Sequence, residues 1–380
     1  MNLFDQSTAT RIVSGPGKIS ALGELARDLE IERVLVVSDP GIVAAGHTQH
    51  GLDSLNQAKR TTRLFDGVSE NPTTEHVAAG LKVAQEFRPE LIVGLGGGSS
   101  MDCAKGINFL VSCGGKMQDY WGIGKATGPM LPMIAVPTTA GTGSETQSFA
   151  LICDAQTHQK MACGDRRAAF RVAILDPELT LTQPPLVAAL TGFDALSHAV
   201  ETSVTKSRTP QSLQYSHAAW QHLAPSFLQV LQEPKDLEAR SQMQQGACLA
   251  GLAIEHSMLG AAHALANPLT AAYGITHGQA VALMLPHVVR FNSPQMEQEY
   301  RELLATTAID SKLPRDGDSL ADFLATVAHE AGLAGKLREC NVRQDNLAQL
   351  AKTAAEQWTG TFNPVPLSTD DFLQLYELAY

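Results

Sequence analysis

The sequence predicts an N-terminal α/β domain built on a parallel sheet, followed by an all-helical domain. In the first half, short apolar, β-branched runs alternate with helical patterns, which is typical of a parallel sheet covered on both faces. Beyond Pro184 and Pro185, patterns with an apolar spacing of about 3.6 residues dominate, and no convincing strand occurs. We therefore expect an α/β domain at residues 1–181 and a helical domain at residues 182–380.

Four strands are expected in the first domain, and their apolar runs are Arg33–Ser38, Thr62–Asp66, Leu91–Leu95 and Met133–Pro137. Thr73 or Thr74 can cap a helix that reaches Phe87. Another helix should open at Gly96–Ser100 and extend through Lys105. In the second domain, helical periodicity covers Tyr215–Leu231, Glu238–Leu265 and Leu320–Leu333.

Composition restricts the possible partners. With 44% hydrophobic and 18% charged residues among 380, the chain is an ordinary globular protein with room for two cores. A formal net charge of −11 argues against nucleic acid or an anionic membrane as a partner, because both need a basic face. The N-terminus has no signal-peptide pattern, and no apolar run reaches the ~18 residues of a membrane span. Six scattered cysteines are typical of reduced thiols, so a cytoplasmic location is expected.

One carboxylate and three imidazoles in the second domain form a candidate metal site. Asp194 and His198 stand four residues apart in a segment without proline or internal glycine, so they share one helix face. His263 and His277 are fourteen apart, with a proline and a glycine between them, which indicates a helix, a break and a second helix start. These groups suit Fe²⁺ or Zn²⁺. The alternative is that they are packed core histidines brought into this pattern by chance.

Two features of the first domain favour binding of a dinucleotide. Gly96, Gly97, Gly98 and Ser99 follow the third strand and open a helix, whose N-terminus can receive a pyrophosphate. They do not form the G-x-G-x-x-G fingerprint, and a tight turn without a ligand is the alternative. Asp39 follows the first strand, where a carboxylate can bind both ribose hydroxyls, although a plain turn aspartate is an equally good interpretation.

The segment Pro137–Glu145 carries four hydroxyl side chains and two glycines in nine residues. Such a loop can wrap a phosphate or a nicotinamide with side-chain and backbone donors. A solvent-exposed loop of this composition is equally common. Lys160, taken alone, is a surface lysine.

Together these stretches resemble the iron-containing alcohol dehydrogenase family, also called group III. The resemblance covers nearly the whole chain through an ordered set of motifs: SDPG at 38–41, ENPT at 70–73, GGGSSMDCAKG at 96–106, VPTTAGTGSE at 136–145, ILDP at 174–177, TGFDALSHAVE at 191–201, AAH at 261–263, ITHG at 275–278 and LPHVVRFN at 285–292. It implies NAD(P)-linked interconversion of a small alcohol and an aldehyde by a cytoplasmic homo-oligomer, a homodimer or larger.

The resemblance also assigns roles by position. The metal ligands would be Asp194, His198, His263 and His277, with Fe²⁺ the expected ion and Zn²⁺ the alternative. The cofactor contacts would be Asn71, Gly97, Gly98, Ser99, Thr138, Thr139, Thr142, Ser144 and Lys160. Asp39 stands where family members carrying aspartate use NAD rather than NADP.

The chain departs from the family pattern at three places. Many members carry a histidine where this chain has Asn267, two asparagines where it has Glu255 and His256, and an arginine where it has Val365. Since asparagine does not titrate near neutral pH, His256 becomes a candidate for the catalytic proton relay, on a continuous helix with His263. The alternative is that His256 only packs. Two other functions stay open: an NAD- and metal-dependent lyase resembling dehydroquinate synthase, and a non-catalytic binding protein.

Overall fold

The computed structural model describes residues 10–157, 159–307 and 316–380, and it divides into two compact units. The first unit comprises residues 1–139 and 143–183, and the second comprises residues 140–142 and 184–380. The main division thus falls at Gln183 and Pro184, whereas the prediction placed a single boundary after residue 181. The prediction assumed one division point along the chain, so it could not assign three residues of the 137–145 loop to the helical unit.

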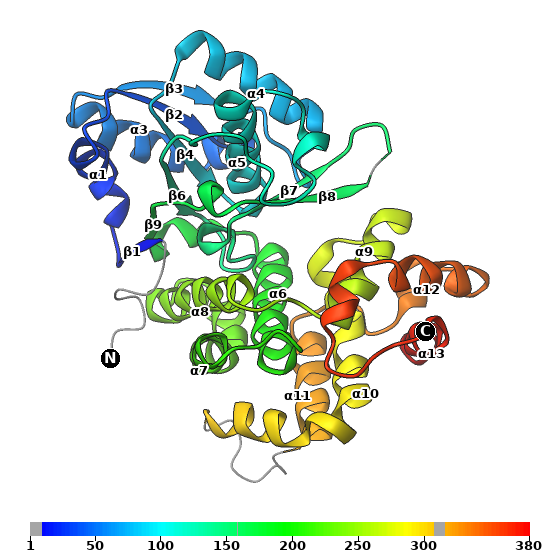
Figure 1. Ribbon diagram of the computed structural model, residues 1–380. Coiled ribbons are helices and arrows are strands. Elements are labelled where there is room, and N and C mark those ends of the chain that lie inside the picture. The colour runs from blue at the N-terminus through cyan, green and yellow to red at the C-terminus, as the bar shows by residue number, and fades with distance from the viewer. Residues whose placement is uncertain (1–9, 158, 308–315) are drawn as a thin grey trace. The chain divides into compact units, whose positions relative to one another are not determined.

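A six-stranded sheet forms the centre of the first unit (Figure 1). Its strands, in spatial order, are β1 (Arg11–Ser14), β9 (Val172–Leu175), β6 (Met133–Pro137), β4 (Leu91–Gly96), β2 (Arg33–Val37) and β3 (Thr61–Phe65). All five pairings are parallel, which confirms the predicted parallel sheet. Strand β2 pairs with β3 on one side and β4 on the other, so the winding of the chain reverses between β2 and β4.

Helices cover both faces of this sheet. The helices of the first unit are η1 (Lys18–Ala21), α1 (Leu22–Asp28), α2 (Pro40–Ala44), α3 (His47–Gln57), α4 (Thr74–Phe87) and α5 (Gly98–Cys113). Alternate residues of the central strands, such as Val34, Val36 and Val93, form one core with Leu22 and Leu55 of α1 and α3. On the other face α5 packs against β4, and α4 packs against α5 and β2. Burial on both faces explains the continuous apolar runs.

The helix α4 begins where the sequence predicted. Thr73 is its N-cap, and His76 completes a reciprocal capping box by accepting the Thr73 backbone N–H at Nδ1, 2.9 Å away. The helix ends at Phe87, because Arg88 adopts a left-handed conformation with φ of 54°.

A second, three-stranded sheet completes the first unit and was not predicted. It has the order β5 (Gly122–Ile123), β8 (Lys160–Gly164), β7 (Phe149–Cys153), and β7 and β8 are antiparallel. Short 3₁₀ turns precede or follow these strands, namely η2 (Met117–Tyr120), η3 (Ser144–Thr146) and η4 (Arg166–Ala168), and a further one, η5 (Pro177–Thr180), follows β9. Each strand here has at most five residues, too few for a clear alternation of apolar side chains.

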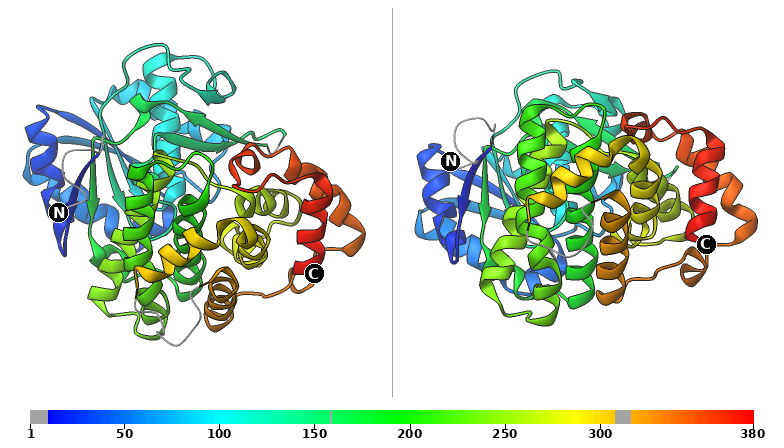
Figure 2. Two further views of the ribbon diagram at one scale, coloured as in Figure 1. Left: turned by 60° about the horizontal axis from the view of Figure 1, so that its bottom comes forward. Right: turned by 90° about the horizontal axis from the view of Figure 1, so that it is seen from below.

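The second unit is helical, as predicted (Figure 2). Its helices are α6 (Pro185–Val204), α7 (Pro210–Gln232), α8 (Leu237–Glu255), α9 (Ala261–Tyr273), α10 (His277–Ala305), α11 (Gly317–Glu330), η6 (Leu337–Cys340), η7 (Gln344–Asn346), α12 (Leu347–Ala355), η8 (Trp358–Phe362) and α13 (Thr369–Ala379). No strand occurs among its described residues, which are 140–142, 184–307 and 316–380. Within the part of the chain that the structure describes, no helix combines the length and apolarity that a membrane span needs.

Helix α6 lies at the centre of this unit and packs against α7, α8 and α10. Glycines allow these close approaches. A Cβ at Gly192 would lie 2.8 Å from the Phe227 ring, and a Cβ at Gly278 would lie 2.2 Å from the Leu190 carbonyl oxygen. The polar residues of α6 are therefore held deep in the unit.

The continuous helix predicted for Glu238–Leu265 is wrong. Helix α8 ends at Glu255, His256 is its C-cap, and α9 begins after Gly260, whose φ and ψ of −125° and −143° are not helical. Apolar spacing runs on across this break, so periodicity alone did not reveal it. A second break lies at Gly274, with φ of 65°, whereas Pro268 sits inside α9.

Candidate metal centre

Helix α6 presents Asp194 and His198 on one buried face. The residues are one turn apart, only 5% and 4% exposed, and the Asp194 Oδ1 lies 3.4 Å from the His198 Nε2. The two helices that follow the breaks supply the other imidazoles. His263 is the third residue of α9, and His277 is the first residue of α10.

All three imidazoles direct Nε2 toward the same carboxylate oxygen. The distance from Asp194 Oδ1 is 3.5 Å to the His263 Nε2 and 3.7 Å to the His277 Nε2. The rings of His198 and His263 are stacked at 5.0 Å, and those of His263 and His277 are tilted at 5.2 Å. The structure thus brings together all four predicted ligands, from three separate helices.

The donor atoms fit a bound cation. Tetrahedral coordination with bonds of about 2.1 Å holds ligand atoms about 3.4 Å apart, close to the spacing between Asp194 and the imidazoles. Ligand atoms of Asp194, His263 and His277 all lie within 4.8 Å of one another, and His198 joins them through Asp194. Within the described part of the chain, the buried Asp194 Oδ1 and His263 Nε2 have no hydrogen-bond partner of normal geometry. A cation would satisfy both atoms.

The electrostatics of the cluster also favour a positive charge. Burial alone would raise the pKa of Asp194, but the neighbouring histidines outweigh it and hold that pKa well below its usual range. Burial lowers the pKa of His198. For His263, burial also acts to lower the pKa, but the carboxylates of Glu201 and Asp194 outweigh it and raise the pKa to about 9. A cation binding here would therefore displace a proton.

Glu201 was not singled out from the sequence, although it lies within the TGFDALSHAVE motif. Its buried carboxylate contacts the His263 Nδ1 at 2.5 Å. The signal was its spacing: Glu201 follows His198 by three residues and Asp194 by seven, so all three lie on one helix face.

In the first unit, Asp39 and the glycine turn meet at the carboxyl ends of β2 and β4, where the winding of the sheet reverses. Ser100 donates its hydroxyl to the Asp39 Oδ2 at 3.1 Å, and the Asp39 Oδ1 caps α2 by accepting the Ile42 N–H. Asp39 thus caps a helix, as the interpretation as a turn aspartate expected. Its half-buried carboxylate can still accept further hydrogen bonds. Crevices at such reversal points are the usual ligand sites of open α/β sheets.

The glycine turn is shaped for close approach of a ligand. Gly96 has φ of 151°, and a Cβ there would lie 2.5 Å from the Ser100 hydroxyl. Gly97 is the N-cap of α5, and Gly98 and Ser99 form its first turn, which makes a helix N-terminus suited to a pyrophosphate.

The 137–145 loop follows β6, next to β4. Thr138 donates its backbone N–H to the Gly96 carbonyl, and Thr139 lies 3.6 Å from an ideal Cβ at Gly97. The Thr138 Oγ1 is buried and has no hydrogen-bond partner among the described residues, which fits a ligand contact. Thr142 is half-buried and belongs to the 140–142 segment of the helical unit.

The Ser144 hydroxyl is engaged inside the protein. It donates to the Asp102 Oδ1 at 2.6 Å and accepts from the Lys105 Nζ at 2.8 Å. Lys105 is fully buried and also donates to the Ser144 and Phe149 carbonyls. Sequence reasoning missed this bridge, whose signal was an Asp and a Lys three apart in a helix with no other charged residue. Ser144 therefore fixes the path of the loop.

Lys160 and the turn that contains Asn71 both lie beside strand β7. Asn71 has φ of 52° in the turn before α4, and Lys160 is exposed at the start of β8. Cys153 of β7 pairs with Lys160 and bridges to Thr73, which connects these two places.

The geometric basis for a relay through His256 is wrong. Because α8 ends at Glu255, His256 does not share a helix with His263, and its ring packs 5.7 Å from that of Tyr215. Asn267 lies one turn after His263 on α9 and donates its amide to the Gln357 Oε1 at 3.1 Å. The position that is histidine in many relatives is therefore held by an amide–amide bond. Val365, at the third departure, accepts the Asn363 amide through its carbonyl.

Comparisons with known proteins agree with this geometry. Residues 9–177 match the family model described as iron-containing alcohol dehydrogenase, and residues 188–380 match the C-terminal model of the same family. Alcohol dehydrogenase 4 of Schizosaccharomyces pombe is 32% identical over 94% of this chain and 85% of that protein. A 1,3-propanediol oxidoreductase structure is similar with a TM-score of 0.93 and 30% identity, over 97% of each chain.

A sulfoacetaldehyde reductase from Bifidobacterium kashiwanohense, solved in complex with NAD⁺, is similar with a TM-score of 0.89 and 27% identity, over 99% of this chain and 98% of that one. The two family matches together cover nearly the entire chain, and the ligand cluster lies within the second. The chain belongs to the iron-containing alcohol dehydrogenase family, whose members are alcohol dehydrogenases and aldehyde reductases.

Proposed function

We propose that this protein is a metal-dependent, NAD-linked enzyme that interconverts a small alcohol and its aldehyde by direct hydride transfer. The observation that carries the proposal is the convergence of three imidazole Nε2 atoms on the Asp194 Oδ1, at 3.4–3.7 Å. Among the described residues no contact favours a lyase or a non-catalytic binding protein, and the family relation argues for the dehydrogenase.

The cation would be held by Asp194, His198, His263 and His277. Three nitrogens and one oxygen suit both Fe²⁺ and Zn²⁺, and the family relation favours Fe²⁺. When bound, the cation supplies Lewis acidity to a substrate oxygen, and the dinucleotide supplies a hydride acceptor. His277 is the most accessible of the four, with a side chain 26% exposed against 5–7% for the others. The substrate oxygen would therefore enter on the His277 side.

The dinucleotide would be NAD. Asp39 would accept hydrogen bonds from the ribose hydroxyls and would repel a 2′-phosphate, which disfavours NADP. The α5 N-terminus would bind the pyrophosphate, and the NAD⁺ complex of the similar sulfoacetaldehyde reductase supports the choice of cofactor. The proposed contacts are Asp39, Asn71, Gly97, Gly98, Ser99, Thr138, Thr139, Thr142, Ser144 and Lys160, with Ser144 acting through its place in the loop.

The protein's residues would bind and orient the reactants. The ligands from α6 and α9, Asp194, His198 and His263, are buried, so water is excluded from their side of the metal site. Oxidation removes a hydride from the carbinol carbon and a proton from its hydroxyl, giving an aldehyde and NADH. His256 is the proposed proton relay, and its imidazole is the feature that supports this role, because it shares no helix with His263. The substrate would be a small alcohol or aldehyde.

The location and assembly of the protein are also proposals. None of its six cysteines, all within the described residues, is joined in a disulfide, which supports a cytoplasmic location. A homo-oligomer, a homodimer or larger, is expected from the family relation and is measurable by light scattering after size exclusion.

A panel of alcohols tests the proposed function. Protein stripped of metal would be reloaded with Fe²⁺ under anaerobic conditions or with Zn²⁺, and NADH formation would be followed with primary alcohols and diols. We expect activity with at least one of the two ions and none in the stripped protein. Equal NADH formation before and after metal removal would contradict a metal-dependent reaction.

A further inference from the structure

We propose that Glu201 is a positioning residue for the metal centre, which fixes His263 in the tautomer and orientation that metal binding requires. This inference rests on the proposed metal site and adds a fifth residue to it. Glu201 lies on α6, one turn after His198, and is only 4% exposed. A carboxylate buried to this degree is costly unless its oxygens are well satisfied.

Both oxygens of Glu201 bind the start of α9. The Oε2 lies 2.5 Å from the His263 Nδ1, and the Oε1 accepts the Ala262 backbone N–H at 2.7 Å. An ionised carboxylate only accepts hydrogen bonds, so the His263 Nδ1 must carry the proton. In the neutral ring the lone pair is then on Nε2, the atom that faces Asp194. The contact selects the tautomer that can bind a cation.

The N-terminus of α9 offers backbone donors to the Glu201 carboxylate. The N-cap is Gly260, which has no side chain, so distant residues cap the helix: Glu201 at Ala262, and Asn363 at Ala261 through a longer bond of 3.4 Å. A Cβ at Gly260 would lie 3.1 Å from the Glu201 Oε1, closer than ordinary contact. The positive end of the helix dipole stabilises the negative charge brought to it.

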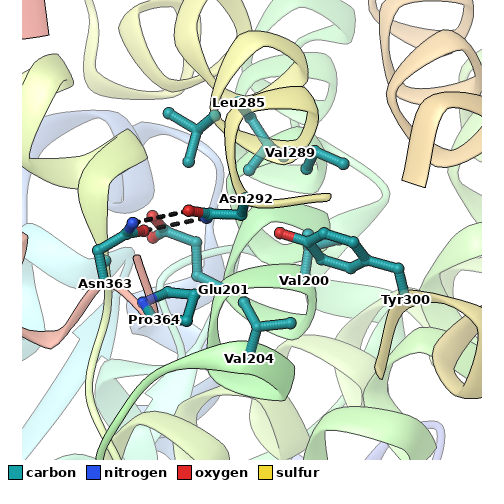
Figure 3. A pocket seen from close by; sticks show the side chains of 11 residues that line it. Val200, Glu201, Val204, Leu285, Val289, Asn292, Tyr300, Asn363 and Pro364 are labelled. Carbon is teal, nitrogen blue, oxygen red and sulfur yellow. Dashed lines mark hydrogen bonds between the residues drawn. The ribbon is translucent and has the colours of Figure 1, made fainter. Parts of the chain in front are cut away.

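Figure 3 shows Glu201 in the lining of a small, mainly apolar pocket. The cavity measures about 10 Å³ and is lined by Glu201, Asn292, Tyr300 and Asn363 among apolar residues of α6 and α10. The amides of Asn292 and Asn363 bond each other reciprocally, at 2.7 and 3.1 Å. A cavity of this size admits at most one water molecule, so bulk solvent screens the carboxylate little.

Charge balance gives Glu201 a second effect on the cation. A divalent ion with Asp194 and three neutral imidazoles carries a net charge of about +1 in a buried site. The Glu201 carboxylate, in contact with one of those imidazoles, brings the cluster to neutrality. Glu201 should therefore raise the affinity for the cation without touching it.

Substitution by glutamine separates this role from simple helix capping. Two donors, the Ala262 N–H and the His263 Nδ1–H, need two acceptors, and a glutamine offers one oxygen. With Glu201→Gln, His263 is left unmatched or turns to the tautomer with a proton on Nε2. Asn363→Ala is the matched control, because it removes the other cap of α9 and leaves the Glu201–His263 contact in place.

The experiment measures the Zn²⁺ Kd of the stripped proteins by competition with a chromophoric chelator, with circular dichroism to verify folding. We expect Glu201→Gln to raise the Kd by about 10- to 100-fold, and Glu201→Asp to recover part of the affinity. The control Asn363→Ala should leave the Kd within a few fold of the wild type while it lowers the unfolding temperature. Equal Kd values for wild type and Glu201→Gln would overturn the inference. A wild type that binds no Zn²⁺ would instead refute the proposed function.

A second measurement covers a Glu201→Gln protein that does not fold. Imidazole ¹H–¹⁵N spectra of the wild type with Zn²⁺ report which nitrogen of His263 carries the proton. A proton on the His263 Nδ1 that is retained in the spectra of Asp194→Asn supports the inference. A proton on Nε2 overturns it.

Discussion

Replacing Gly278 by alanine tests whether the packing of α10 on α6 sets the geometry of the metal site. Gly278 directly follows His277 in the first turn of α10. An ideal Cβ at this position would lie 2.2 Å from the Leu190 carbonyl oxygen and 2.7 Å from its carbon, and both are backbone atoms of α6. Since backbone cannot rotate away, the first turn of α10 must move.

The size of that movement follows from the contact distances. Ordinary van der Waals contact begins at 3.4 Å, so the new methyl group must retreat by about 1 Å. Metal ligands tolerate about 0.2 Å, so His277 would be displaced beyond that range. Overpacking of this kind costs about 1–3 kcal/mol, whereas alanine gains up to about 1 kcal/mol over glycine in a helix interior. Steric strain should therefore exceed the gain in helix propensity.

We expect Gly278→Ala to raise the Zn²⁺ Kd by about tenfold or more and to lower the unfolding temperature. Gly335→Ala is the control, since an ideal Cβ there meets nothing within 4 Å. Chelator competition and thermal unfolding would be run on both variants. A Gly278→Ala protein that binds Zn²⁺ as the wild type does would refute the link between helix packing and ligand geometry.

Three further predictions concern the first unit. Asp39→Gly should relax the preference for NAD over NADP, measured as the ratio of kcat/KM values, and a wild type that uses NADP equally well would contradict the role of the carboxylate. Lys105→Met should lower the free energy of unfolding, measured in urea, by about 3–5 kcal/mol, because it removes the ammonium group that pairs with the buried Asp102. A loss below about 1 kcal/mol would show that the bridge is dispensable. Burial raises the pKa of Glu145 from 4.5 to about 7, so folding stability should fall as the pH rises through this interval; Glu145→Gln should remove that dependence, and an unchanged pH profile would refute it.

Strong, uniform patterns in the sequence were enough to predict the central elements of the fold. The continuous apolar runs of β2, β4 and β6 and the capped start of α4 lie where the sequence placed them to within one residue. Strands β1 and β9 were not predicted, because each has only four residues and is placed by pairing with distant strands: β1 with β9, about 160 residues away, and β9 also with β6. Non-local pairing leaves no local signal.

The candidate site shows the same limit. Helical spacing was enough to place Asp194 and His198 on one face, and the break at Gly274 separates the two helices that carry His263 and His277. The break at Gly260 was missed because apolar spacing continues across it, and with it the capping of α9 by Glu201. Partners supplied by other helices cannot be read from the periodicity of one helix.

Metal analysis of His277→Ala tests the central claim most directly. Wild-type protein loaded with Fe²⁺ or Zn²⁺ should hold about one ion per chain and form NADH from an alcohol. His277→Ala should stay folded, lose most of the ion and almost all turnover, whereas His329→Ala, at an exposed position in the last turn of α11, should lose neither. Undiminished metal stoichiometry in His277→Ala would contradict the assignment of the four ligands.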